Sequence, residues 1–274
     1  NSLFLQPVVV TSAKFQSAVR LDRNIFGKEV DFSNSVFEQG IDISHSHFFS
    51  TAKFKEVNFT AISDFSYSQF EELTEFNKSL FKQGANFTRT VFIKPINFSS
   101  AIFSDRFIFA KSKFLESLIL INTTFEKTIT FRDIYINGII NLQDAHLLDR
   151  LDFSNGFFTP KASINTSGLA FDSADAKIIG DKGIGKFIDV NKLETNETVL
   201  RNLIRNFRNS EQISDANYIE YRREQLKAKQ ISDRLLKTSW RKVFTWGWIH
   251  VIPQWLMLNL LLILGDYGTN INLI

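Results

Sequence analysis

Residues 85–103 read ANFTRTVFIKPINFSSAIF, and phenylalanine occupies positions 87, 92, 98 and 103 of this stretch. The steps between these phenylalanines are five, six and five residues long. In an α-helix, such steps point successive side chains about 140° and 240° apart and scatter them around the axis. Short strands separated by turns instead let every phenylalanine point inward. The stretch therefore predicts a solenoid of short strands rather than a helix.

The same spacing continues far beyond this stretch. Steps of eleven residues from Phe4 to Leu169 and from Val10 to Ile164 meet 31 positions, all large and apolar, and 22 of them are phenylalanine. A fixed period over this length is the signature of a repeat architecture. We predict a structural core stack made of Phe48, Phe54, Phe59, Phe65, Phe70, Phe76, Phe81, Phe87, Phe92, Phe98, Phe103 and Phe109.

The residues that lie two positions before these apolar anchors differ between the two series. On a strand, such residues point to the same side as the anchor. In the first series they are small, as at Ser35 and Ser79, whereas in the second they are more often large, as at Val30 and Ile41. The sequence thus predicts two kinds of face that alternate along the chain.

Three segments, TAKFKEVNF (51–59), GANFTRTVF (84–92) and FAKSKFLESLIL (109–120), resemble the A-[DN]-[LF]-x-x unit of the pentapeptide-repeat family in a phenylalanine-rich form. The resemblance extends over roughly Phe4 to Leu169. It implies an all-β solenoid, a right-handed quadrilateral β-helix, whose coils each contain two eleven-residue units. About seven and a half coils would form a rod roughly 35 Å long at ~4.8 Å per coil. Residues 170–187 lose the spacing, and we expect them to form a last irregular coil and cap that completes a domain of residues 1–190.

The charge of the chain changes near residue 191. Residues 1–190 carry 20 basic and 21 acidic side chains, a net charge of −1, whereas residues 191–274 carry 12 and 8, a net charge of +4. A near-neutral rod without a basic stripe favours neither DNA mimicry nor nucleic-acid binding, so we expect no nucleic-acid partner. The chain contains no cysteine, which excludes disulfides and thiolate metal sites.

Residues 191–237 have the pattern of a helical hairpin. The first helix places Val199, Leu200, Leu203, Ile204 and Phe207 on one face, with Thr195 or Asn196 as the N-cap. A second helix follows from Ser214. We interpret the hairpin as a cap on the solenoid, with a tetratricopeptide-like binding module as the alternative.

Residues 238–274 contain all four tryptophans of the chain and an apolar run. Aromatic and basic side chains beside an apolar run are typical of a membrane interface. The run from Val251 to Leu264 is too short to span the hydrocarbon layer, so we predict an interfacial membrane-proximal segment, with a buried helix as the alternative. Its predicted membrane-proximal residues are Trp240, Arg241, Lys242, Trp246, Trp248 and Trp255.

The region from Leu200 onward is similar to bacterial membrane proteins that join pentapeptide repeats to a two-helix potassium-channel-like domain. In those proteins a tyrosine–arginine patch on an amphipathic hairpin precedes a hydrophobic run that ends in a GYG-like tripeptide. The matching residues are Tyr218, Tyr221, Arg222 and Arg223 for the patch and Tyr267 and Gly268 for the tripeptide, whereas Asp266 departs from it. Spanning helices and a pore loop are not evident in this sequence, so conduction is not expected of it.

The sequence contains few candidate catalytic or metal-binding residues. His45 and His47 flank Ser46, and we interpret them as solvated turn residues rather than a metal pair. The stretch from Gly180 to Lys186 matches the first seven positions of a P-loop, but Phe187 stands at the Ser/Thr position. We therefore expect no enzyme activity, no cofactor and no metal site.

The sequence as a whole predicts a non-catalytic scaffold that displays a rigid β-helix to a protein partner at a membrane surface or membrane complex. The chain begins at Asn1 and its only methionine is Met257, which fits a processed secretory product and an extracytoplasmic position at a bacterial or thylakoid membrane. One alternative is the accessory domain of an ion-channel-like protein. Another is a soluble topoisomerase-binding rod.

Overall fold

A computed structural model describes residues 2–193, 196–237, 253, 255–257 and 260. The chain divides into two compact units, residues 1–189 and 190–274. The division falls one residue before the predicted boundary. The two units are considered separately below.

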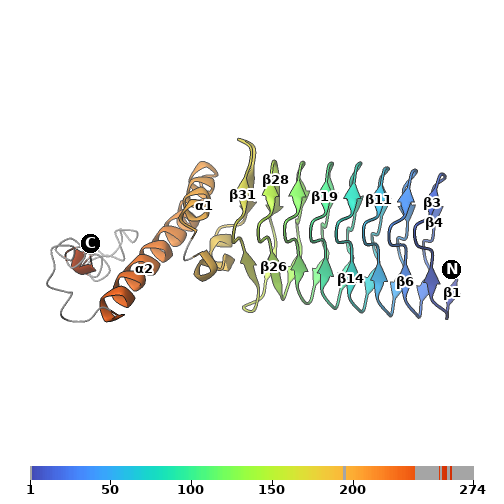
Figure 1. Cartoon of the computed structure of the whole chain (residues 1–274), viewed down its shortest axis with the longest axis horizontal. Helices are drawn as coiled ribbons and strands as arrows, with labels where there is room; N and C mark the ends of the chain where they lie inside the picture. Colours follow the sequence, from blue (N-terminus) through green and yellow to red (C-terminus); the bar gives the residue numbers. More distant parts are fainter. Residues whose placement is uncertain (1, 194–195, 238–252, 254, 258–259, 261–274) are drawn as a thin grey trace. The chain divides into compact units, whose positions relative to one another are not determined.

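The first unit is a quadrilateral β-solenoid, as the sequence predicts. Its strands form four parallel sheets of eight strands each, and strands that pair in most of the solenoid lie 22 residues apart in the chain. Figure 1 shows the coils side by side, from the blue coil at β1 to the yellow coil at β31. Each sheet forms one flat side of the solenoid, and we call these sides faces A, B, C and D.

The strands are mostly two residues long because the chain turns a corner after each side of the square. Face A contains β1 (Leu3–Phe4), β5 (Ile25–Phe26), β9 (His47–Phe48), β13 (Gln69–Phe70), β17 (Val91–Phe92), β21 (Lys113–Phe114), β25 (Tyr135–Ile136) and β29 (Phe157–Phe158). Face B contains β2 (Val8–Val9), β6 (Val30–Asp31), β10 (Ala52–Lys53), β14 (Thr74–Glu75), β18 (Ile96–Asn97), β22 (Leu118–Ile119), β26 (Ile139–Asn141) and β30 (Ser163–Asn165). Face C contains β3 (Lys14–Phe15), β7 (Val36–Phe37), β11 (Asn58–Phe59), β15 (Leu80–Phe81), β19 (Ile102–Phe103), β23 (Thr124–Phe125), β27 (His146–Leu147) and β31 (Ala170–Phe171). Face D contains β4 (Val19–Arg20), β8 (Ile41–Asp42), β12 (Ser63–Asp64), β16 (Ala85–Asn86), β20 (Phe107–Ile108), β24 (Ile129–Thr130), β28 (Arg150–Phe153) and β32 (Lys177–Gly180).

The core consists of four columns of inward side chains, one for each face. Within a column, rings from successive coils stack almost parallel, as in Phe65 on Phe87 with centroids 4.6 Å apart and planes 1° apart. The spacing is set by the distance between hydrogen-bonded strands. The structure places all twelve phenylalanines of the predicted core stack at 0–1% exposure. Burying each such side chain contributes about 2–3 kcal/mol, and ring stacking adds to this.

Two edges of the solenoid hold a continuous row of residues other than glycine with left-handed backbone conformation. Every eleventh residue from Ser12 to Asn155 has a positive φ between 53° and 62°. For residues other than glycine this conformation costs about 1–2 kcal/mol, and backbone hydrogen bonds between coils, such as Arg23 N to Ser44 O at 2.8 Å, offset it. The edge between faces B and C contains Ser12, Asn34, Glu56, Lys78, Ser100, Asn122 and Asp144. The edge between faces D and A contains Arg23, His45, Tyr67, Arg89, Lys111, Asp133 and Asn155.

The small residues that precede the first series of anchors are buried, and their hydroxyls join neighbouring coils. Ser79 is 1% exposed; its Oγ accepts a hydrogen bond from Val57 N at 3.2 Å and donates one to Phe54 O at 2.5 Å. Ser35 and Ser112 make the same pair of bonds one or more coils away. These hydroxyls supply hydrogen-bond partners to buried backbone groups. At Ser112 the two groups, Thr90 N and Phe87 O, also bond each other at 3.1 Å.

Replacing Ser79 with alanine is expected to lower the free energy of unfolding by about 1–3 kcal/mol, because two buried backbone groups lose their partner. Alanine fits the site, since Ala101 occupies the equivalent position in the next coil. The measurement is the urea midpoint of the β-sheet circular-dichroism signal. Ser104→Ala, a serine on the outer side of face C, should change the stability by less than about 0.5 kcal/mol. Equal effects of the two changes would contradict the role of the buried hydroxyls.

The predicted register is wrong in the last coil. The eleven-residue step holds to Phe158, which pairs with Ile136, but Ile164 then pairs with Ile140, 24 residues earlier. The chain has two extra residues in the turn around Pro160 and Lys161. Ile164 and Leu169 remain buried, yet each lies two positions before the place that the sequence assigned to it. Because both residues are apolar and point inward in either register, the sequence pattern could not reveal the insertion.

The last coil ends in a short 3₁₀ helix, η1 (Ile184–Phe187). Phe187 stacks on Phe158 with ring centroids 4.7 Å apart, and Ile188 pairs with Ile164. Ile184 and Ile188 are both buried. These contacts agree with the irregular final coil expected for residues 170–187.

The second unit contains a 3₁₀ helix, η2 (Val190–Leu193), and two α-helices, α1 (Glu197–Asn209) and α2 (Ile213–Lys237). Asn196 is the N-cap of α1, and its side chain accepts a hydrogen bond from Val199 N at 3.1 Å. α1 and α2 pack against each other. The five apolar residues predicted for one face of α1 are all buried, namely Val199, Leu200, Leu203, Ile204 and Phe207.

Candidate functional site: an arginine pocket in the helical hairpin

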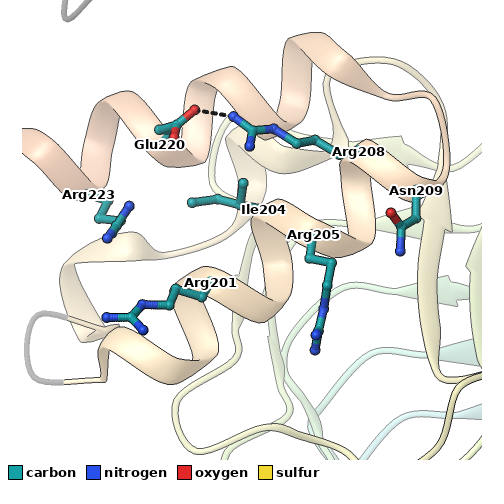
Figure 2. A pocket seen from close by; sticks show the side chains of 7 residues that line it. All are labelled: Arg201, Ile204, Arg205, Arg208, Asn209, Glu220 and Arg223. Carbon is teal, nitrogen blue, oxygen red and sulfur yellow. Dashed lines mark hydrogen bonds and ion pairs between the residues drawn. The ribbon is translucent and has the colours of Figure 1, made fainter.

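A pocket of about 330 Å³ opens between α1 and α2. Figure 2 shows that α1 supplies most of its side chains and that α2 supplies Glu220 and Arg223. Four of the seven lining residues are arginines. The lining residues are Arg201, Ile204, Arg205, Arg208, Asn209, Glu220 and Arg223.

The helical period explains how three of these arginines come together. Arg201, Arg205 and Arg208 follow one another at steps of four and three residues, so they lie on one side of α1. Cations at such spacings repel each other and destabilise a helix by about 0.2–0.5 kcal/mol per pair. The helix therefore carries a small electrostatic cost at this place, which an anion would relieve.

Acidic side chains neutralise only part of this charge. Arg208 Nη2 forms an ion pair with Glu220 Oε2 at 2.6 Å, drawn as the dashed line in Figure 2. Glu197, at the start of α1, accepts hydrogen bonds from Arg201 Nε at 3.1 Å and from Arg223. Glu224 also pairs with Arg223, at 3.5 Å, and Lys227 pairs with both Glu224 and Glu197. Four guanidinium groups and one ammonium group thus meet three carboxylates, which leaves an excess of two positive charges around the pocket.

Arg205 is the arginine of the pocket that forms no ion pair with any described residue. Its Nη2 donates a hydrogen bond to Asn202 Oδ1 at 2.9 Å, its one polar contact in the described part of the chain. A guanidinium group of this kind keeps most of its five donors available and matches the geometry of a carboxylate or phosphate.

The ion pair between Arg223 and Glu197 changes the acidity of both groups. The hydrogen bond from Arg223 holds the pKa of the Glu197 carboxyl below its usual range, and the same bond raises the pKa of Arg223. Arg223 is the most enclosed of the paired arginines, with 19% of its side chain exposed against 69% for Arg201. Glu197 therefore holds the N-terminal turn of α1 to the middle of α2.

The lowered pKa of Glu197 predicts that the hairpin loses stability in acid. The contribution of this carboxylate is complete above the ordinary glutamate pKa of ~4.3 and is lost as the pH falls through the lowered pKa of the folded state. The pair is partly exposed, so the effect should be about 1 kcal/mol or less. Thermal unfolding of the helical circular-dichroism signal, measured from pH 7 to pH 3, should show this loss.

The variant Glu197→Gln should lack this component of the pH dependence, whereas Glu211→Gln should keep it. Glu211 is exposed and forms no ion pair with a described residue. A pH profile of Glu197→Gln that coincides with that of the unmodified chain would contradict the assignment.

The structure separates the tyrosine–arginine patch that the sequence suggested. Arg223 lines the pocket, whereas Arg222 Nη2 donates to Asn191 Oδ1 at 3.0 Å and the Tyr221 hydroxyl accepts a hydrogen bond from Gln225 at 2.6 Å. Tyr218 is partly exposed on α2 and does not line the pocket. The site thus shares one residue with the predicted patch and takes its other arginines from α1.

Most of the predicted membrane-proximal residues lie outside the described part of the chain, namely Trp240, Arg241, Lys242, Trp246 and Trp248, as do Asp266, Tyr267 and Gly268. Trp255 is described, and its Nε1 donates a hydrogen bond to Ser232 Oγ at 2.7 Å. None of the helices in the described ranges combines the length and the apolar character that a membrane span requires.

The remaining candidates from the sequence have structural contacts. His47 pairs with Glu71 at 2.7 Å, and His45 stacks on Tyr67. Gly180 ends β32, and the next helical element is the four-residue η1 rather than an α-helix. Within the described ranges, no group of three or more His, Cys, Asp or Glu side chains is arranged to hold a metal ion.

Comparisons of the chain with protein-family models, with curated proteins and with solved structures found no match.

Proposed function

We propose that this protein is a non-catalytic scaffold that binds an anionic membrane surface through the arginine pocket of its helical hairpin. The observation that carries the proposal is the excess of two positive charges around the pocket, with Arg205 free of any ion pair among the described residues. Arginine forks bind phosphate through two parallel hydrogen bonds, which favours a phosphate group as the ligand.

The sequence that follows the hairpin supports a lipid headgroup as the source of that phosphate. Trp240, Arg241 and Lys242 lie within five residues of the end of α2, and three more tryptophans follow before residue 256. Basic and aromatic side chains beside an apolar run favour the interface of a bilayer with anionic lipids. A pocket of about 330 Å³ lies at the small end of the range for ligand sites and suits a single headgroup.

The role proposed for the solenoid is that of a rigid body held at this surface. Its regular 22-residue coils and phenylalanine columns are consistent with a pentapeptide-repeat β-helix, and we propose that it belongs to that class. A β-solenoid of this kind resists bending because each coil is hydrogen-bonded to its neighbours on all four faces. It would present its outer faces to a protein partner.

Reversing the charge of Arg205 tests the proposal. Arg205→Glu changes the local charge by two units, and each basic residue near an anionic surface is worth about 1 kcal/mol. The expected result is that affinity for vesicles of phosphatidylcholine with phosphatidylglycerol falls about thirty-fold. The measurement is cosedimentation of the full chain over a range of lipid concentrations. The hairpin should stay folded because Arg205 contacts only Asn202 by a hydrogen bond.

The matched control is Lys82→Glu, the same change of charge at an exposed residue on face C that forms no ion pair with a described residue. This variant should bind like the unmodified chain. The proposal would be overturned if the full chain does not bind anionic vesicles. It would also be overturned if the Arg205→Glu variant binds them as tightly as Lys82→Glu does.

A further inference from the structure

The four outer faces of the solenoid differ in their chemistry. On faces B, C and D most outward side chains are polar or charged; on face B, for example, Asp31, Lys53 and Glu75 lie on successive coils. On face A, large apolar side chains occupy outward positions in every coil except the one that holds Gln69 and Glu71. They include Ile25, Phe49, Ile93, Leu115, Tyr135 and Phe157. We call this surface the apolar face.

The exposed side chains of the apolar face are large, and some are paired. Ile25, Phe49 and Phe157 are 43%, 51% and 62% exposed. Phe157 stacks on Tyr135 with centroids 5.5 Å apart, and Phe49 stacks on His47 at 4.0 Å. Exposed apolar side chains that gather on one side of a protein often mark a binding surface.

The edge between faces D and A adds a row of cations beside the apolar face. Arg23, Arg89 and Lys111 are exposed there, and none forms an ion pair with a described residue. Arg89 lies over the ring of Tyr67 at 5.4 Å, and that ring in turn stacks on His45. The net charge of the solenoid is close to zero, so the charge count of the sequence does not indicate that these cations lie in one row.

Several cations elsewhere on the solenoid have acidic partners, although others, such as Lys82 and Lys127, form no ion pair with a described residue. Lys53 pairs with Glu29 on face B, and Lys14 with Glu38 on face C. On the opposite edge, Lys78 pairs with Glu56 at 2.9 Å.

We infer that the apolar face and its basic edge form a second membrane-binding surface, by which the solenoid itself lies against a bilayer of anionic lipids. This inference rests on the proposed membrane association. A bilayer is flat, as is a face built from parallel strands of eight coils, and it offers apolar depth beneath anionic phosphates. Glu71 on face A is paired with His47, and Glu116 beside Leu115 is paired with Lys94. Asp133 is the one acidic residue among the positive-φ positions of the edge, against three cations. Tyr67 extends the row with a side chain that favours the interfacial layer.

The absence of cysteine allows a direct test. Phe49→Cys on the apolar face and Lys82→Cys on face C each give a full chain with one thiol, which can carry the environment-sensitive nitrobenzoxadiazole dye. Both sites directly follow a buried phenylalanine, Phe48 and Phe81. With vesicles of phosphatidylcholine and phosphatidylglycerol, the dye at position 49 should shift to the blue and brighten several-fold. The dye at position 82 should not change.

A charge variant gives a second measurement. Arg89→Gln with Lys111→Gln removes two cations from the basic edge and should weaken vesicle binding about thirty-fold. Lys82→Gln with Lys127→Gln removes two exposed cations that have no ion pair with described residues and should leave binding unchanged. Circular dichroism checks that all variants are folded.

The outcomes separate this inference from the proposed function. If the chain binds vesicles but the dye at position 49 does not respond, the inference is overturned, the proposed function stands, and the apolar face is left for a protein partner. If positions 49 and 82 respond equally, the inference is also overturned. If position 49 still responds in the Arg205→Glu background with undiminished affinity, the solenoid face binds lipid and the arginine pocket does not. A chain that binds no vesicles overturns both.

Discussion

Replacing Phe48 with alanine is expected to lower the free energy of unfolding of the solenoid by about 3–5 kcal/mol. The Phe48 ring is 1% exposed and stacks between Phe26 at 4.7 Å and Phe70 at 4.5 Å, so its removal leaves a cavity in the column and separates two rings. The coils cannot close the gap, because their spacing is fixed by the hydrogen bonds between strands. The urea midpoint of the β-sheet circular-dichroism signal measures the effect.

The neighbouring residue provides a matched control. Phe49 follows Phe48 in the chain but points outward and is 51% exposed. Phe49→Ala deletes the same atoms and loses only the stacking on His47, so it should cost about 1 kcal/mol or less. Equal losses of stability at the two positions would contradict the assignment of Phe48 to the inward side and Phe49 to the outward side, and therefore the arrangement of the solenoid core.

Replacing Gly84 with alanine is the second change with a large expected effect, about 3 kcal/mol or more. Gly84 has a φ of +83°, which a side chain disfavours. A Cβ there would also lie 2.0 Å from the carbonyl oxygen of Arg106 in the next coil. That oxygen belongs to the backbone of a strand corner and cannot rotate away, so the two coils would have to separate. The same urea titration measures the loss.

Gly183 separates the two causes. It has a φ of +101°, but a Cβ at this position meets no atom within 4 Å. Gly183→Ala should therefore cost only the conformational part, about 1–2 kcal/mol. If Gly84→Ala were no more destabilising than Gly183→Ala, the close approach of successive coils at this corner would be contradicted.

The architecture of the solenoid can be predicted from the sequence because one physical constraint repeats. Each side of the square must return one large apolar side chain to the interior, so steps of five and six residues recur and fix the anchors. The inward orientation of the small and large residues before the anchors can also be predicted from the sequence, and the structure buries both Ser79 and Val30. Where the constraint weakens, the prediction fails, as in the two-residue insertion before Ile164.

The left-handed corners could not be predicted from residue type. Arg23, Tyr67 and Arg89 have no preference for positive φ, and the conformation is imposed by the path of the coil and by hydrogen bonds to the next one. The sequence therefore conceals the basic edge, whose members lie 22 residues apart in the chain.

Only part of the arginine pocket could be predicted from the sequence. The spacing of Arg201, Arg205 and Arg208 places them on one side of a helix, which a sequence analysis can recognise. Glu220 and Arg223 join them only because α2 packs against α1, and this contact depends on tertiary structure. The tyrosine–arginine resemblance drew attention to Arg223 but not to the residues of α1 that surround it.

The central claim is that the hairpin holds the protein to an anionic membrane. The most direct test is flotation on a density gradient with vesicles that contain phosphatidylglycerol, comparing the full chain, its Arg205→Glu variant and a chain that ends at Lys237. We predict that the full chain floats, that the shortened chain, which keeps the pocket but lacks the tryptophan-rich segment, floats weakly, and that the Arg205→Glu variant remains largely at the bottom. A full chain that stays at the bottom of the gradient with the lipid at the top would contradict the account.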